Sequence, residues 1–135
     1  MVSAKDPQTI VRVLQTAGFQ AKLDKDDVGD PMITSASSGS KFAIYFYGCT
    51  DKSDCRAVQF VTSYDTKEGA TPSLEKINAW NLNQRFGTAF IDKEGDPALK
   101  MDVDLDDGGM SGALFTDNLE FWTAVMSAFE KHIGW

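Results

Sequence analysis

The segment from residue 99 to residue 105 has the most restrictive pattern in the chain, a strict alternation of apolar and polar side chains. Leu99, Met101, Val103 and Leu105 share one side of an extended strand, and the polar residues between them share the other. Shifting the strand pairing by one residue would place the two aspartates of this segment in the core. The segment therefore predicts a β-strand of fixed register with one face in a hydrophobic core.

Five other segments show the period of two that is expected of strands, and turn residues separate most of them. In the third and fourth strands apolar residues occupy both faces, which predicts central strands that are covered on two sides. Tight turns between neighbouring strands predict antiparallel pairing. The predicted strands span residues 19–23, 32–36, 42–47, 55–64, 86–92 and 98–105.

Three segments have the spacing and the capping residues of helices. Asp6 followed by Pro7 predicts a first helix that ends near Gly18. The same start signal recurs at residues 71–73, before a second helix that ends ahead of residue 87. From residue 115 to residue 133 apolar side chains recur every three or four positions, which predicts a long C-terminal helix.

The predicted order is helix, four strands, helix, two strands and helix. At 135 residues the chain has room for one hydrophobic core, and no linker or repeat divides it. We therefore expect an α+β fold in a single domain over residues 1–135. It should contain an antiparallel β-sheet of about five to six strands flanked by three helices.

The charge of the chain excludes two classes of partner. Lys and Arg number 13 and Asp and Glu number 20, so the formal net charge is −7. This surface repels nucleic-acid phosphates and anionic lipid surfaces. No apolar run approaches the roughly 20 residues of a membrane-spanning helix. We expect neither nucleic-acid binding nor membrane insertion.

Cys49 and Cys55 flank a polar loop between two apolar strands. Three interpretations are open: a structural disulfide, two reduced thiols in a cytosolic protein, and redox or metal chemistry. The spacing is not that of a Cys-x-x-Cys motif, and two thiolates do not complete a zinc site. We favour a disulfide between them, because a hairpin brings its two ends within bonding distance.

The first residues have no apolar core of a signal peptide. Either the protein is cytoplasmic, or its export signal has been removed from the sequence. The favoured disulfide supports a periplasmic or otherwise exported protein.

The chemistry of common enzymes is missing from the sequence. His132 is the single histidine, and no nucleophile elbow, phosphate loop or dinucleotide fingerprint occurs. The acidic run at residues 102–108 fails as a calcium loop, with Asp107 where glycine is needed and Ala113 where glutamate is needed. We predict no catalytic residue, no metal site and no cofactor.

Two sets of residues have both a structural and a functional interpretation. Trp80 and Asn81 fit best as a core residue and an amide that bonds nearby backbone, rather than as ligand contacts. The long C-terminal helix has a wider apolar face than one sheet contact needs. Its candidate interaction surface consists of Phe121, Trp122, Val125 and Ala128.

Residues 77–81, 85–92 and 95–104, together with the cysteine hairpin of residues 47–60, resemble the YbjN family of bacterial sensory transduction regulators. The motif residues that carry the resemblance are Asn78, Trp80, Asn81, Gly95 and Asp96. The resemblance implies a fold similar to type III secretion chaperones, with an antiparallel sheet between helices and frequent dimerisation. It implies no enzymatic activity.

These observations favour a non-catalytic protein-binding module, either a chaperone-like adaptor or a regulator in bacterial signalling or stress response. Its expected partner is another protein or a second copy of the chain. The alternative is a small-molecule or ion sensor with a pocket between the sheet and the helices.

Overall fold

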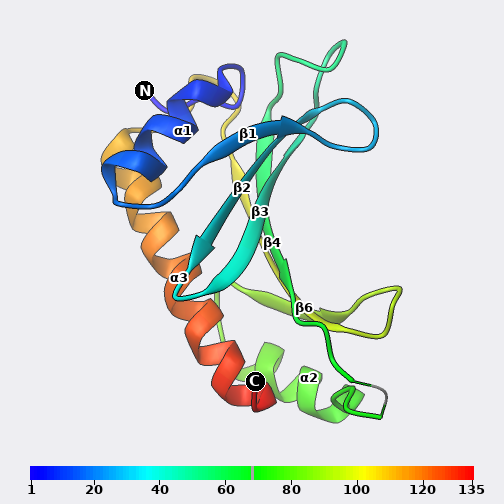
Figure 1. Ribbon diagram of the computed structural model, residues 1–135. Coiled ribbons are helices and arrows are strands. Elements are labelled where there is room, and N and C mark those ends of the chain that lie inside the picture. The colour runs from blue at the N-terminus through cyan, green and yellow to red at the C-terminus, as the bar shows by residue number, and fades with distance from the viewer. Residues whose placement is uncertain (68) are drawn as a thin grey trace.

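The computed structural model describes residues 1–67 and 69–135, and its elements follow the predicted order (Figure 1). Three helices and six strands form one α+β fold, which confirms the predicted fold class. The elements are α1 (Pro7–Thr16), β1 (Lys22–Lys25), β2 (Pro31–Ser37), β3 (Ser40–Tyr47), β4 (Ala57–Ser63), α2 (Leu74–Asn83), β5 (Thr88–Ile91), β6 (Pro97–Asp104) and α3 (Gly112–Ile133).

All six strands belong to one antiparallel sheet with the order β1-β2-β3-β4-β6-β5. The strand with the strict alternation, β6, lies between β4 and β5. Its Leu99 and Val103 are buried, and its Asp102 and Asp104 are exposed. The predicted register of β6 is therefore confirmed.

Side-chain caps fix where the helices begin. The Asp6 carboxylate accepts a hydrogen bond from the backbone N–H of Gln8 and starts α1. Ser73, rather than Thr71, caps α2. Ser111 caps α3 through the backbone N–H of Leu114.

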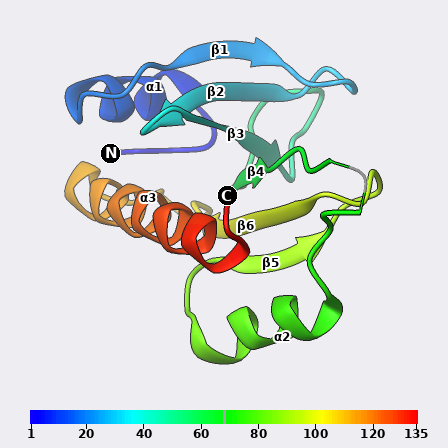
Figure 2. The ribbon, with the colours of Figure 1, turned by 60° about the horizontal axis from the view of Figure 1, so that its bottom comes forward.

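Helices α1 and α3 cover one face of the sheet, while α2 packs on β5 and on the C-terminal half of α3 (Figures 1 and 2). An aromatic cluster fills the space between the sheet and α3. The Trp122 ring lies 5.5 Å from the Phe60 ring and 6.1 Å from the Phe42 ring, between centroids. The core therefore joins the central strands directly to α3.

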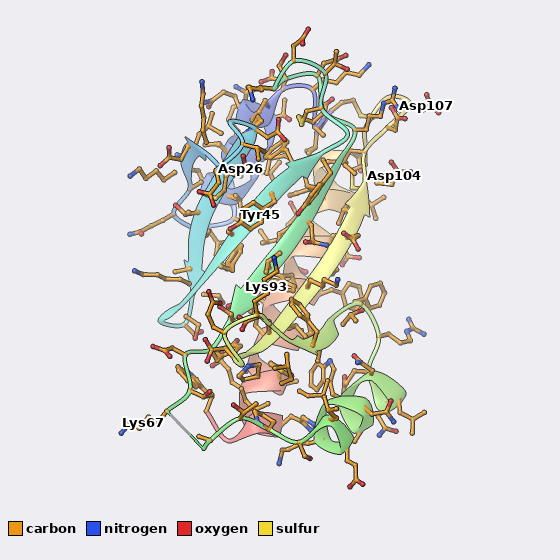
Figure 3. The ribbon with its side chains drawn as sticks, turned by 90° about the vertical axis from the view of Figure 1, so that its right-hand side faces the viewer. Asp26, Tyr45, Lys67, Lys93, Asp104 and Asp107 are labelled. Atoms are coloured by element: carbon orange, nitrogen blue, oxygen red, sulfur yellow. A yellow bond between two sulfur atoms is a disulfide. The ribbon has the colours of Figure 1, made fainter. Side chains whose placement is uncertain are left out.

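No described helix covers the opposite face of the sheet (Figure 3). The expectation of a sheet lying between helices, covered on two sides, is therefore wrong. Ala43, Tyr45 and Val61 point to this face and remain partly exposed. Sequence alternation misled here because these apolar residues share the face with Lys, Gln, Asp and Ser side chains, which keep it compatible with water.

The first strand also differs from the prediction. β1 spans Lys22–Lys25 instead of residues 19–23, and all four of its residues are exposed. Leu23, an apolar residue that alternates with polar neighbours in the sequence, is 38% exposed. The cause is its place in the sheet, because an edge strand that pairs only with β2 lies at the margin of the core.

Candidate functional site

The connection between α2 and β5 is held by side chains of α2. The indole Nε1–H of Trp80 donates a 3.0 Å hydrogen bond to the carbonyl of Gly87. The side-chain amide of Asn81 donates to the Ala89 carbonyl at 3.0 Å and accepts from the Ala89 N–H at 2.8 Å. Trp80 is 2% exposed and lies in the core. The two neighbouring motif residues thus clamp the chain between helix and strand.

Gly87 adds a second restraint to this connection. A Cβ atom at this position would lie 3.0 Å from Cγ2 of Val125 and 3.2 Å from Cδ1 of Leu99. The absence of a side chain lets the backbone approach α3 and β6 closely. The position of residue 87 is therefore fixed by packing as well as by hydrogen bonding.

Phe86, between Arg85 and the fixed Gly87, has a strained backbone. Its φ is +73°, and the Gly87 N–H donates a 2.9 Å hydrogen bond to the Arg85 carbonyl. A bond across three residues with positive φ at the centre is the rare, strained form of the γ-turn. For a bulky residue such a conformation persists only where the surroundings enforce it, and it is enriched at functional sites.

The strained turn presents an aromatic surface, which we call the Phe86–Phe121 platform. The two rings stack with centroids 4.3 Å apart and an interplanar angle of 21°. Phe86 is 43% exposed and Phe121 is 41% exposed. The Arg85 guanidinium carbon lies 5.3 Å from the centroid of the Phe86 ring. Two large aromatic rings thus lie stacked against each other at the surface.

The platform revises the interaction surface expected on the last helix. Trp122 and Val125 are buried in the core and are therefore not available to a partner. Of the four residues expected on this surface, Phe121 is exposed and Ala128 is half-buried. Two helical turns before Phe121, Leu114 is 51% exposed and extends the apolar surface along α3. The broad apolar face of α3 is explained mainly by the core.

Sequence reasoning missed Phe86, because it was assigned to the strand that follows. The signal that could have identified it is local. An aromatic residue stands between an arginine and a glycine, directly after a helix, where a turn is needed.

The cysteine hairpin contains a disulfide between Cys49 and Cys55. Its loop includes three non-glycine residues with positive φ, at positions 51, 52 and 54. The ammonium group of Lys52 donates a hydrogen bond to the carbonyl of Val28 in the β1–β2 turn. The bridge therefore closes a tightly folded loop that contacts the neighbouring turn.

The remaining motif residues belong to the β5–β6 turn and to the surface of α2. Gly95 supplies a positive φ of +83° in that turn. The Asp96 carboxylate accepts hydrogen bonds from the N–H of Thr66, at 3.1 Å, and from its hydroxyl, at 3.2 Å. Asn78 is exposed on α2. Asp96 thus ties the turn to the segment that precedes α2.

Three carboxylates of the β5–β6 turn, from Asp92, Glu94 and Asp96, have oxygens within 4.8 Å of one another. Asp92 accepts bonds from the backbone N–H groups of Glu94 and Asp96. Asp92 and Asp96 thus have structural hydrogen-bonding roles that account for their presence in the turn.

The single histidine and a buried tyrosine stabilise the C-terminal end of α3. The His132 Nε2 atom lies 2.7 Å from the carbonyl oxygen of Lys76, joining α3 to α2. The Tyr64 hydroxyl donates a 2.8 Å hydrogen bond to the Glu130 carboxylate. Burial, together with this bond and the charge of Glu130, raises the pKa of Tyr64 above its usual value.

Comparison with known protein families matches residues 6–135 to YbjN, described as "Putative bacterial sensory transduction regulator". The chain belongs to the YbjN family. The match covers nearly the whole chain, including Trp80 and Asn81 of α2, the platform and the cysteine hairpin. A search among curated proteins finds no match. The YbjN description is that of a regulator rather than an enzyme. Within residues 1–67 and 69–135, no helix has the length and apolar character needed to cross a bilayer.

Proposed function

We propose that this YbjN domain is a non-catalytic regulator that binds a segment of another protein on the Phe86–Phe121 platform. The observation that carries the proposal is the strained γ-turn at Phe86. Its conformation costs on the order of 1–3 kcal/mol, and the Trp80, Asn81 and Gly87 restraints maintain it. The strained turn exposes an aromatic pair next to an arginine, and phenylalanine and arginine are both enriched in protein interfaces relative to the rest of the surface.

The size of the platform favours a short segment over a second copy of the chain. Phe86, Phe121 and Leu114 are about half exposed, and together they offer roughly 250 Å² of surface, since a large apolar side chain has about 150–250 Å². A stable dimer buries about 800 Å² on each partner. A peptide or a single helix from a partner protein fits the smaller area.

The test compares wild type, Phe121→Ser and the control Leu74→Ser in affinity capture from the native compartment. Leu74 is an exposed apolar residue at the end of α2 opposite Phe86. A partner recovered with wild type and with the control is then purified and titrated by calorimetry. We expect Phe121→Ser to weaken its affinity about tenfold or more and Leu74→Ser to leave it unchanged. Equal affinity for all three proteins would overturn the proposal.

The second measurement is light scattering after size exclusion at several concentrations. We expect a monomer for wild type and for Phe121→Ser. A wild-type dimer that Phe121→Ser dissociates would overturn the choice of occupant and assign the platform to a second copy.

The alternative of a small-molecule sensor has weaker support. The space between the sheet and α3 is filled by the aromatic cluster around Trp122. A hollow of about 610 Å³ lies instead on the open face of the sheet. As for location, the disulfide supports an exported protein, because such bonds persist in oxidising compartments.

A further inference from the structure

The open face of the sheet, opposite α1 and α3, has an ordered set of side chains. In one row across the strands, Tyr45 lies beside Gln59 and Gln59 beside Asp102. The Gln59 amide donates a 2.9 Å hydrogen bond to the Asp102 carboxylate. In the next row, Tyr47 occupies the β3 position and Asp104 the β6 position. Each row thus has a tyrosine on one strand and a carboxylate two strands away.

A shallow hollow of about 610 Å³ adjoins these rows on the same face. Ala43, Tyr45 and Val61 supply its apolar lining, and Lys22 and Lys41 contribute from its margin. The volume is sufficient for a large side chain of a partner. The open face therefore has an apolar centre next to its tyrosine–carboxylate rows.

The whole net charge of the chain lies at one end of the sheet. Antiparallel pairing brings residues 24–30, 51–56 and 102–107 to this end, and Figure 3 shows Asp26, Asp104 and Asp107 toward it. These three segments contain ten aspartates and three cations, a formal charge of −7. The other ten carboxylates and ten cations of the sequence cancel.

The carboxylates at this end of the sheet affect the pKa of Tyr47. Its pKa is raised above the usual value by partial burial, by Tyr45 and by the carboxylates of Asp102 and Asp26. Carboxylates from β6 and from the β1–β2 turn thus act on the same tyrosine. The acidic end thus lies close enough to the tyrosine rows to act on one of their side chains.

We propose that the open face is a second binding surface, whose occupant is a basic protein segment that carries arginines and apolar residues. It is independent of the Phe86–Phe121 platform, which lies at α3 on the covered side of the sheet. A guanidinium group can stack on a tyrosine ring and form paired hydrogen bonds with a carboxylate. The tyrosine–carboxylate rows offer both contacts, and an apolar side chain of the segment fills the hollow.

The test uses a fluorescein-labelled peptide of alternating arginine and leucine, and a matched peptide of glutamate and leucine. Fluorescence anisotropy is measured with wild type, with Asp102→Asn/Asp104→Asn, and with the control Asp117→Asn/Glu120→Gln. The control removes the same charge from exposed positions on α3. We expect the β6 variant to weaken binding of the arginine peptide about tenfold and the control to change it less than about twofold. Equal losses in both variants, or equal binding of the acidic peptide, would overturn the proposal.

Two further measurements locate the bound peptide. Amide chemical shifts should change at Ala43, Tyr45 and Val61 on titration with the arginine peptide. Phe121→Ser should bind this peptide as wild type does, because Phe121 belongs to the other surface. Loss of peptide binding in Phe121→Ser, or shift changes confined to α3, would overturn the assignment to the open face while leaving the platform proposal standing.

Discussion

The side-chain amide of Asn81 exchanges two hydrogen bonds with the backbone of Ala89, so a residue of α2 pairs with β5 as a neighbouring strand would. The pairing occupies both the N–H and the C=O of a buried residue. Together with the bond from Trp80 to Gly87, it fixes the path of the chain between helix and strand. The platform depends on that path, because Phe86 lies in the middle of it.

Asn81→Ala should lower the free energy of unfolding by about 2 kcal/mol, because it leaves the buried N–H of Ala89 without its acceptor. Urea denaturation measures the effect. Asn78→Ala on the exposed side of the same helix is the matched control and should change stability by less than about 0.5 kcal/mol. Equal effects of the two variants would refute the role of the Asn81 pairing.

Gly87→Ala should destabilise the fold by about 1–3 kcal/mol, because the added methyl group meets Val125 and Leu99 at close range. Val125→Ala should cost less stability in the Gly87→Ala background than in wild type, because it makes room for the added methyl group. Gly112→Ala is the control, since its added Cβ has no neighbour closer than 4.0 Å. Thermal denaturation of these variants, with Val125→Ala alone included, tests the prediction. A Gly87→Ala protein as stable as wild type would contradict it.

Two replacements of Phe86 distinguish the strain of its backbone from the loss of its ring contact with Phe121. Phe86→Ala and Phe86→Gly both lose the ring contact with Phe121, but only glycine adopts the positive φ without a steric penalty. The glycine variant should therefore be about 1 kcal/mol more stable than the alanine variant. Chemical denaturation measures the difference. At an exposed position without strain, the alanine variant is usually the more stable of the two. That result would show that the backbone of Phe86 is unstrained.

Removing the disulfide should destabilise the fold by about 2 kcal/mol, the chain-entropy value for a loop of about seven residues. The Cys49→Ser/Cys55→Ser protein should melt at a lower temperature than the oxidised wild type. A reducing agent should lower the melting temperature of wild type and leave the variant unaffected. If oxidised and reduced wild type melt together, the disulfide adds no stability.

The bond between Tyr64 and Glu130 predicts a loss of stability in alkaline solution. The pKa of Tyr64 is raised in the folded protein, so the folded state holds its proton more tightly than the unfolded state. The resulting stabilisation is complete below a pH of about 10 and declines as the pH rises further. The stability difference between wild type and Tyr64→Phe should therefore shrink above that pH. Urea denaturation across the alkaline range measures it, and a constant difference would contradict the prediction.

Most of the fold could be predicted from local pattern. The alternation in β6 determined both its register and its buried face, because a shift by one residue would bury the charged side chains of Asp102 and Asp104. The start of α1 followed from Asp6, and the start of α2 followed from residues 71–73, although Ser73 rather than Thr71 is the cap. These features depend on neighbours in the sequence, so the sequence alone reveals them.

Features that depend on distant parts of the chain could not be predicted in the same way. Whether Leu23 is buried depends on the margin of the core at β1, and whether Tyr45 is covered depends on where three helices pack. The candidate site shows the same limit. Phe121 was predicted from its helix, but Phe86 required the path of the α2–β5 connection, which Val125 and Leu99 determine by packing on Gly87.

The gathering of all net charge at one end of the sheet has a kinetic consequence. A molecule that is neutral over most of its surface and negative at one end turns in the field of a cationic target before contact, so collisions are biased toward one orientation. Encounter with such a target would be fast at low ionic strength and would slow steeply as added salt shortens the reach of the field. The arrangement of the aspartates would thus set the orientation in which the molecule meets a cationic target.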